Sequence, residues 1–160
     1  MDLQHLQARA EADGCFCVVG GLIVNNERQV FVQKRSPDRQ LFPGCWDIAG
    51  GHVEPGETLF EALAREIEEE TGWQLVEIKE VVDIIDWEEE TDGQTRKNRE
   101  FDFVVEVRGD LDQPQIEEEK FTEFRWVGQA ELEVLKESRL ADDTLIFELV
   151  GKALAQSIHT

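Results

Sequence analysis

Residues 58–72 carry both a start signal and a stop signal for an α-helix. Thr58 and Glu61 form a capping box, in which the side chain of each residue bonds the backbone N–H of the other. Gly72 supplies the left-handed conformation that ends many helices. We therefore expect a helix over residues 59–71. Its core face should carry the apolar residues that recur at helical spacing, which are Phe60, Leu63, Ala64 and Ile67.

The same helix places three carboxylates on a neighbouring face, at Glu66, Glu69 and Glu70. Side chains three and four residues apart on a helix lie about 5–6 Å from each other, so these charges repel. The last turn of a helix also favours cations over anions. A solvated acidic face is one interpretation of this run. The other is a site for a hard divalent cation, which would reverse the sign of each of these interactions.

The residues around this helix match a known sequence motif. Gly51, Glu57 and the run over residues 65–73 fill every specified position of the Nudix box, G-x5-E-x7-R-E-U-x-E-E-x-G-U, where U is a bulky apolar residue. The chain therefore resembles the Nudix hydrolases, and the number of fixed positions makes the match specific. Nudix hydrolases cleave a nucleoside diphosphate linked to another moiety and use a divalent metal. The resemblance implies Mg²⁺ as the cofactor, with Mn²⁺ as a substitute.

The resemblance also implies a role for each position of the box. The expected metal ligands are Gly50 through its carbonyl, Glu66, Glu69 and Glu70. The expected structural positions are Gly51, Glu57, Arg65 and Gly72. In this family the loop glutamate typically bonds the helix arginine, which here pairs Glu57 with Arg65 and fixes the turn against the helix.

Two carboxylates are candidates for the general base that takes a proton from the attacking water. The resemblance favours Glu66, because it has a central place on the metal face. The second candidate is Glu119, in an acidic loop over residues 111–120, where relatives often supply an additional glutamate. A solvated loop is the alternative interpretation of Glu119.

Substrate contacts are expected from Arg35 and Trp46. Arg35 leaves a strand directly before the loop that leads to the box, and an arginine there often touches phosphate in similar enzymes. Its planar guanidinium suits that role, although a surface basic residue is the alternative. Trp46 could stack on a base, as could Phe42 and Trp87. An aromatic side chain in a strand more often packs in the core.

The charge of the chain limits its partners. Its 36 acidic and 16 basic residues give a formal net charge of −20. Such a surface repels nucleic-acid polymers and anionic lipid. The resemblance to the Nudix hydrolases implies that the partner is a small-molecule nucleotide or nucleoside diphosphate derivative. The longest apolar stretch, over residues 15–24, is too short to span a bilayer. We therefore expect no membrane contact and a cytoplasmic protein.

The pattern of elements predicts an α/β fold. A chain of 160 residues is about the size of one domain, so a single Nudix hydrolase domain is expected over residues 1–160. A strand over 15–24 is expected to pair with one over 30–35 through a turn at 25–27. Other expected strands are 46–50, 75–87, 101–107 and 124–127, with a hairpin tip at 88–98; other helices are 1–12, 129–137 and 142–156. Strands interleaved with helices predict a mixed-sheet α/β/α sandwich.

The sequence constrains the identity of the substrate less than it constrains the fold or the reaction. The chain has no Tyr, which speaks against the dinucleoside polyphosphate type of Nudix hydrolase. We expect a MutT-like pyrophosphohydrolase of a (deoxy)nucleoside triphosphate or a nucleotide sugar. The alternative is a Nudix-fold module or sensor that binds a nucleotide without cutting it. Many relatives form dimers, so the sequence leaves open whether this chain is a homodimer.

Overall fold

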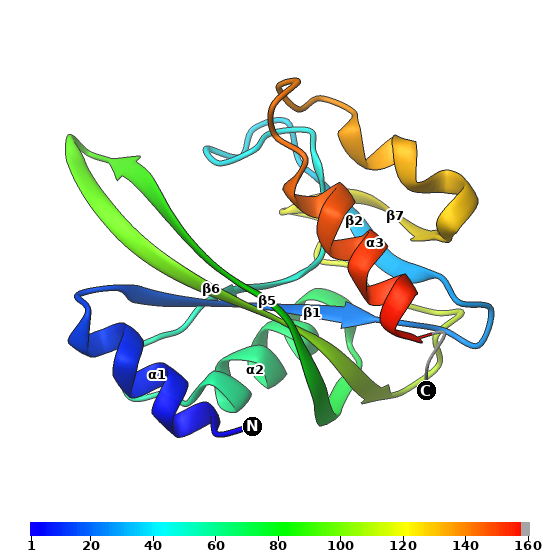
Figure 1. Ribbon diagram of the computed structural model, residues 1–160. Helices are drawn as coiled ribbons and strands as arrows, with labels where there is room; N and C mark the ends of the chain where they lie inside the picture. The colour runs from blue at the N-terminus through cyan, green and yellow to red at the C-terminus, as the bar shows by residue number, and fades with distance from the viewer. Residues whose placement is uncertain (158–160) are drawn as a thin grey trace.

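The computed structural model describes residues 1–157, which form two β-sheets between layers of helices (Figure 1). The four-stranded sheet has the order β4-β1-β6-β5, with bounds Ala49–His52, Phe16–Ile23, Gln94–Arg108 and Gln74–Thr91. The three-stranded sheet has the order β3-β2-β7, with bounds Trp46–Asp47, Val30–Arg35 and Phe121–Val127. β1 runs parallel to β6, and its other neighbour is antiparallel, so the larger sheet is mixed.

Helices cover the sheets on two sides. Helices α1 (Leu3–Ala12) and α2 (Leu59–Thr71) pack on one side with residues of β1 and β6. The 3₁₀ helix η1 (Gln129–Lys136) and helix α3 (Leu145–Ser157) pack on the other side (Figure 1). The expected α/β/α sandwich with a mixed sheet is confirmed. Within the described residues, no helix is long and apolar enough to cross a membrane.

Helix α2 begins and ends where its local signals predict. The Glu61 backbone N–H donates to Oγ1 of Thr58 at 3.1 Å, and the Thr58 backbone N–H donates to Oε1 of Glu61 at 3.0 Å. Gly72 ends the helix with a φ of 80°. Its fully buried face consists of Leu59, Ala62, Leu63 and Ile67.

The expected core position of Phe60 is wrong, because its side chain is 38% exposed. Successive residues of a helix differ by about 100° around its axis. Once Leu59 and Leu63 face the sheet, Phe60 is turned toward solvent, while Ala64 is half-buried. The apolar residues of α2 are therefore divided between the core and the surface.

The expected pairing of residues 15–24 with residues 30–35 is also wrong. β1 and β2 lie in different sheets, and the hairpin between them closes with the single bridge Val24–Val30. Both edges of β1 are occupied, one by β4 and the other by β6. β2 instead lies between β3 and β7.

Two other strand predictions need correction. The predicted strand over 46–50 is two short strands, because β3 pairs with β2 whereas β4 pairs with β1. The predicted hairpin tip over 88–98 is mostly strand, since β5 and β6 continue to a two-residue turn at Asp92 and Gly93. Both turn residues have positive φ, as a tight hairpin turn requires. The hairpin therefore extends far beyond the rest of the sheet (Figure 1).

The two C-terminal helices are shorter or tighter than predicted. The predicted helix over 129–137 is the 3₁₀ helix η1, and the one over 142–156 begins later, at Leu145. The Leu145 backbone N–H donates to Oδ1 of Asp143 at 3.5 Å, so Asp143 precedes the helix and does not belong to it.

A close contact between β1 and β6 gives space to a buried carboxyl near the functional site. Gly20 is opposite Asp102 in the register of these strands. A Cβ added at Gly20 would collide with Oδ1 of Asp102 and would lie 2.7 Å from Cδ1 of Ile48. Glycine at this position therefore leaves the space that the Asp102 carboxyl occupies.

We predict that Gly20→Ala lowers the free energy of unfolding by about 1–3 kcal/mol, as overpacking of a core usually does. The matched control is Gly151→Ala in α3, where the nearest side-chain atom lies at 4.0 Å. Alanine there should stabilise the helix by about 0.5–1 kcal/mol. Urea unfolding of both variants tests this, and equal stability of Gly20→Ala and the wild type would contradict it.

Candidate active site

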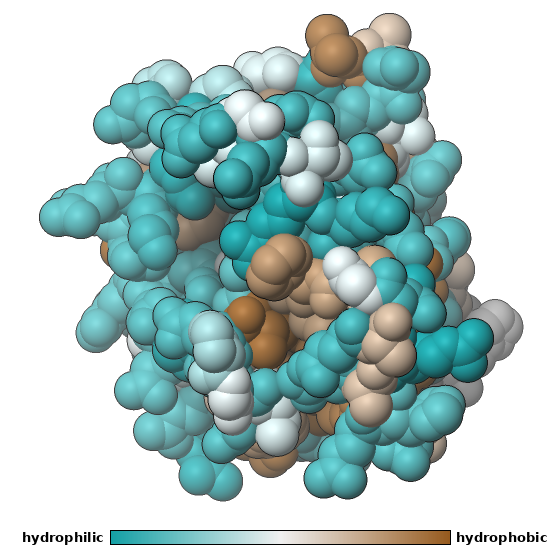
Figure 2. Space-filling view, turned by 90° about the vertical axis from the view of Figure 1, so that its left-hand side faces the viewer, coloured by the Kyte–Doolittle hydropathy of each residue, from teal (hydrophilic) through white to brown (hydrophobic). Residues whose placement is uncertain are grey.

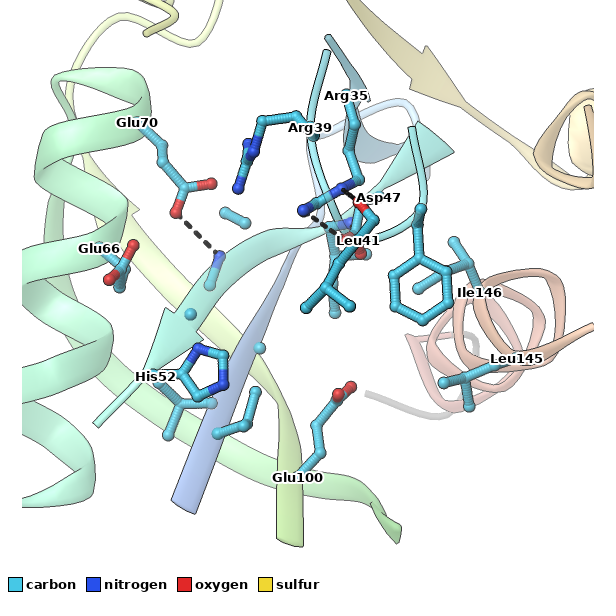
Figure 3. Close-up of a pocket in the computed structure, with 18 of the residues that line it drawn as sticks. Arg35, Arg39, Leu41, Asp47, His52, Glu66, Glu70, Glu100, Leu145 and Ile146 are labelled. Atoms are coloured by element: carbon cyan, nitrogen blue, oxygen red, sulfur yellow. Dashed lines mark hydrogen bonds and ion pairs between the residues drawn. The ribbon is translucent and has the colours of Figure 1, made fainter. Parts of the chain in front are cut away.

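A cavity of about 540 Å³ lies between the N-terminal half of β1, helix α2 and the start of α3. Figure 3 shows Glu66 and Glu70 entering it from α2, Arg39 and Arg35 to the right of Glu70, and Glu100, Leu145 and Ile146 on the other side. Figure 2 shows the face on the left in Figure 1, where hydrophilic side chains surround apolar ones in a hollow. The cavity thus combines charged and apolar walls.

Glu70 is a buried carboxylate held by neutral donors. Its side chain is 1% exposed. The Gly50 backbone N–H donates to Oε2 at 3.2 Å, and the Gln33 amide donates to Oε1 at 3.1 Å. Burial, followed by the adjacent Glu66, raises the pKa of Glu70 well above its ordinary value. The charged form is therefore costly unless a cation joins it.

Glu66 occupies space that a glycine leaves free. Its side chain is 12% exposed and lines the cavity next to Glu70. A Cβ added at Gly51 would lie 2.6 Å from the carboxyl carbon of Glu66. A side chain at residue 51 would therefore push the Glu66 carboxylate out of this position.

Arg65 joins the turn, the end of β4 and the helix. Its Nε and Nη2 donate to the two carboxylate oxygens of Glu57, at 2.8 and 3.0 Å. Nη2 also donates to the backbone carbonyl of His52 at 3.1 Å, and Nη1 donates to Glu66 at 2.7 Å. The bond with Arg65 lowers the pKa of Glu57, and the bond with Glu57 raises the pKa of Arg65.

The structure does not bring Glu69 to the cavity. Its side chain is 46% exposed and lies 3.4 Å from Nη1 of Arg65, one helical turn earlier. The same nitrogen also donates to Glu66. Among residues 1–157, no three or more side chains of His, Cys, Asp and Glu are grouped so that they could hold a metal ion. The role of Glu69 as a ligand stays a prediction.

The carboxylates that do lie together suit a hard cation. Glu66 and Glu70 are adjacent, and the two groups that donate to Glu70, the Gln33 amide and the Gly50 N–H, are uncharged. Mg²⁺ takes oxygen ligands and often binds through one or two carboxylates together with substrate phosphates. These two carboxylates therefore fit such an ion, and the Gly50 carbonyl as a further ligand stays a prediction.

The other predicted site residues lie in three kinds of surroundings. Arg35 lines the cavity, where its Nε donates to the Leu41 carbonyl at 2.8 Å; burial lowers its pKa. Trp46 is 1% exposed and belongs to the core against η1 and α3, so it does not line the cavity. Glu119 is exposed, and the cavity is reached by its neighbour Lys120.

Sequence reasoning missed the polar residues of β6. Glu100 lines the cavity, and the fully buried Asp102 lies beside it on the same face of the strand. The available signal was the Asp within the otherwise apolar run over residues 101–105, because an acidic residue is rarely buried without a partner. Phe42 and Trp87, which the sequence did suggest as stacking residues, line the cavity with ring centroids 6.3 Å apart.

Comparisons with known proteins agree with this geometry. The model of the NUDIX domain family matches residues 17–149. The nucleoside triphosphatase NudI of Escherichia coli K12 is 33% identical over 117 residues, which are 69% of this chain and 80% of that protein. The crystal structure of a MutT protein from Methanosarcina mazei has a TM-score of 0.66 at 28% identity, covering 86% of this chain and 94% of that one. The solution structure of the E. coli ORF135 protein has a TM-score of 0.63 at 25% identity, covering 89% and 92%.

The ion pair of Glu57 with Arg65 predicts a pH-dependent stability. Because Arg65 lowers the pKa of Glu57 below its ordinary 4.5, the pair stabilises the fold above pH 4.5 and loses this effect as the pH falls through the lowered pKa. Glu57→Gln should cost about 1–2 kcal/mol at pH 7.

Urea unfolding between pH 7 and pH 3.5 measures this difference. It should be constant down to about pH 5 and shrink below pH 4.5. Glu68→Gln, an exposed change of the same charge on α2, is the control and should differ little from the wild type. A Glu57→Gln deficit that stays the same at pH 3.5 would show that the charge of Glu57 is not its source.

Proposed function

Since this chain belongs to the Nudix family of hydrolases, we propose that it hydrolyses a pyrophosphate bond of a (deoxy)nucleoside triphosphate in a Mg²⁺-dependent reaction. The proposal rests on the division of the cavity into an acidic part and an aromatic part. Glu66 and Glu70 line one part, and the rings of Phe42 and Trp87 line another. A nucleotide has the same division, with a charged phosphate chain and a flat base.

Glu66, Glu70 and the carbonyl of Gly50 are the residues proposed to hold the ion. A bound divalent cation would neutralise phosphate charge and lower the pKa of the attacking water. Arg65 donates to Glu66 and so fixes the direction of that carboxylate. Gly51 keeps the space in front of Glu66 open. Both effects preorganise the carboxylate before a substrate binds.

Glu66 is also the proposed general base, because its carboxylate lines the cavity beside Glu70. Glu119 is the second candidate. It is exposed on the loop before β7, next to Lys120 at the rim of the cavity. Exposure leaves its side chain free to turn toward a bound substrate. Because Glu66 is also a proposed metal ligand, the informative variant is Glu119→Gln, and a large fall of kcat in it would favour Glu119 as the base.

Basic residues on the opposite wall are proposed to bind phosphate oxygens. Arg35, Arg39 and Lys120 line the cavity. The bonds from Arg35 to the Leu41 carbonyl and to Asp47, at 2.8 and 3.3 Å, hold its guanidinium in place. A guanidinium held in this way suits phosphate recognition.

The name of one relative supports nucleoside triphosphates as the substrate class. The E. coli protein to which the chain is 33% identical is a nucleoside triphosphatase, and the chain covers 80% of it. We therefore place nucleoside triphosphates before nucleotide sugars. The net charge of −20 favours a small nucleotide over a nucleic-acid polymer.

We predict that millimolar Mg²⁺ raises the melting temperature of the wild type by several degrees, because the ion binds the folded carboxylates and not the unfolded chain. The double variant Glu66→Gln/Glu70→Gln should melt at the same temperature with and without Mg²⁺. Glu68→Gln, in the same helix, should keep the full shift. An undiminished shift in the double variant would contradict the proposed ion site.

A substrate panel tests the reaction. Nucleoside and deoxynucleoside triphosphates, nucleotide sugars, ADP-ribose and dinucleoside polyphosphates are incubated with the wild type and Mg²⁺, and released phosphate and pyrophosphate are measured. At least one triphosphate should turn over. Glu66→Gln should lower kcat by about 10²–10⁴-fold, and Glu68→Gln should leave it unchanged. Binding of nucleotides without turnover would instead indicate a non-catalytic Nudix module.

A further inference from the structure

Glu100 enters the cavity from β6, apart from the carboxylates of α2. In Figure 3 its carboxylate points into the cavity on the side of Leu145, whereas Glu66 and Glu70 lie across from it. The Trp87 indole N–H donates to Oε1 of Glu100 at 3.1 Å. This bond fixes the direction of the carboxylate without neutralising it, so Glu100 presents a held acceptor to the cavity.

Asp102 lies beside Glu100 on the same face of β6 and is 0% exposed. Neither of its carboxylate oxygens has a hydrogen-bond donor among the described residues. Its Oδ1 occupies the space that Gly20 leaves by lacking a side chain, and Gly20 itself lines the cavity. A fully buried carboxylate without a donor is costly, so its presence in this place calls for a proton or a ligand.

A proton held between the two carboxyls accounts for this arrangement. Burial raises the pKa of Asp102 well above its ordinary value, and the negative charges of Glu100 and Asp47 add to this effect. Burial also raises the pKa of Glu100. A protonated Asp102 donates its O–H to Glu100, and two carboxyls that share one proton keep one negative charge. That charge resides on Glu100, which faces the cavity.

The walls around Glu100 suit a flat ring. Phe42 and Trp87 contribute aromatic surfaces, and Leu145 and Ile146 contribute apolar ones. Hydrogen bonds to a base edge discriminate strongly in such apolar surroundings, because a mismatch leaves a buried polar group unpaired. Glu100 is therefore placed to read the edge of a base stacked in this part of the cavity.

We propose that Glu100 is a specificity-determining residue that accepts hydrogen bonds from a nucleobase with a ring N–H beside an amino group, and that Asp102 positions it. An ionised carboxylate only accepts hydrogen bonds, and its two oxygens can take two neighbouring donors. Among the common bases, guanine offers this pair of donors on its pairing edge. The inference rests on the proposed function in that a nucleotide occupies the cavity.

Guanine and hypoxanthine nucleotides provide the matched probes, because they differ by one amino group. Binding of GMP and IMP is measured by calorimetry, and kcat/KM is measured for GTP and ITP. The wild type should prefer the guanine nucleotide by about tenfold or more in both measurements. Glu100→Gln should reduce both ratios to within about twofold, because the amide presents its own N–H to the base.

The control is Glu106→Gln, an exposed position of the same strand that is outside the cavity. It makes the same change of charge and should keep both ratios. A wild-type ratio near one, an unchanged ratio in Glu100→Gln, or no binding of GMP and IMP to the wild type would overturn the inference. Failure of the proposed function is seen separately, as absence of turnover across the whole triphosphate panel while GMP is still preferred.

Two substitutions of Asp102 separate positioning from packing. The side-chain amide introduced by Asp102→Asn would offer an N–H to Glu100 in place of the acid proton, so this variant should keep most of the guanine preference. Asp102→Leu fills the space with an apolar group and should lose it. The melting temperature of each variant is measured first, to show that it folds. Equal ratios in both folded variants would contradict the positioning role.

Discussion

A single guanidinium holds the candidate active site together. Arg65 bonds Glu57 in the turn, the His52 carbonyl at the end of β4, and Glu66 in its own helix. It therefore determines how helix α2 lies against β4 and which way the Glu66 carboxylate faces. Its Nη1, which donates to Glu66, also lies 3.4 Å from the exposed Glu69. One residue thus contacts the turn, the sheet and two of the carboxylates of the helix.

The sequence predicted what local signals determine. Both ends of α2 follow from Thr58, Glu61 and Gly72, which act within one helical turn of each end. Strand pairing is not local, and the partners of β1 come from residues far along the chain. For the same reason, the sequence did not reveal the buried Asp102, and it suggested a substrate contact for Trp46, which lies in the core. Whether a strand side chain lines a cavity or the core depends on which elements cover that face of the sheet.

A bound cation would reconcile an acidic protein with an anionic substrate. The cavity is lined by seven acidic residues, Glu66, Glu70 and Glu100 among them, and by four of the 16 basic residues, which are Arg35, Arg39, Lys120 and Arg139. The remaining surface is strongly negative, which repels long polyanions over many contacts. A small nucleotide would meet only the cavity, where the four basic side chains and a cation on Glu66 and Glu70 would offset the acidic charge. A mononucleotide would therefore bind where a polymer is repelled.

The long hairpin of β5 and β6 carries Trp87 and Glu100, whereas α2 carries Glu66 and Glu70. Two separate pieces of chain thus supply the wall proposed to bind the base and the wall proposed to bind the cation. Substitutions in the hairpin can change ligand preference during evolution without disturbing the helix. Duplicated genes can then diverge in the ligand that they prefer, one amino-acid exchange at a time, while the residues of α2 are retained.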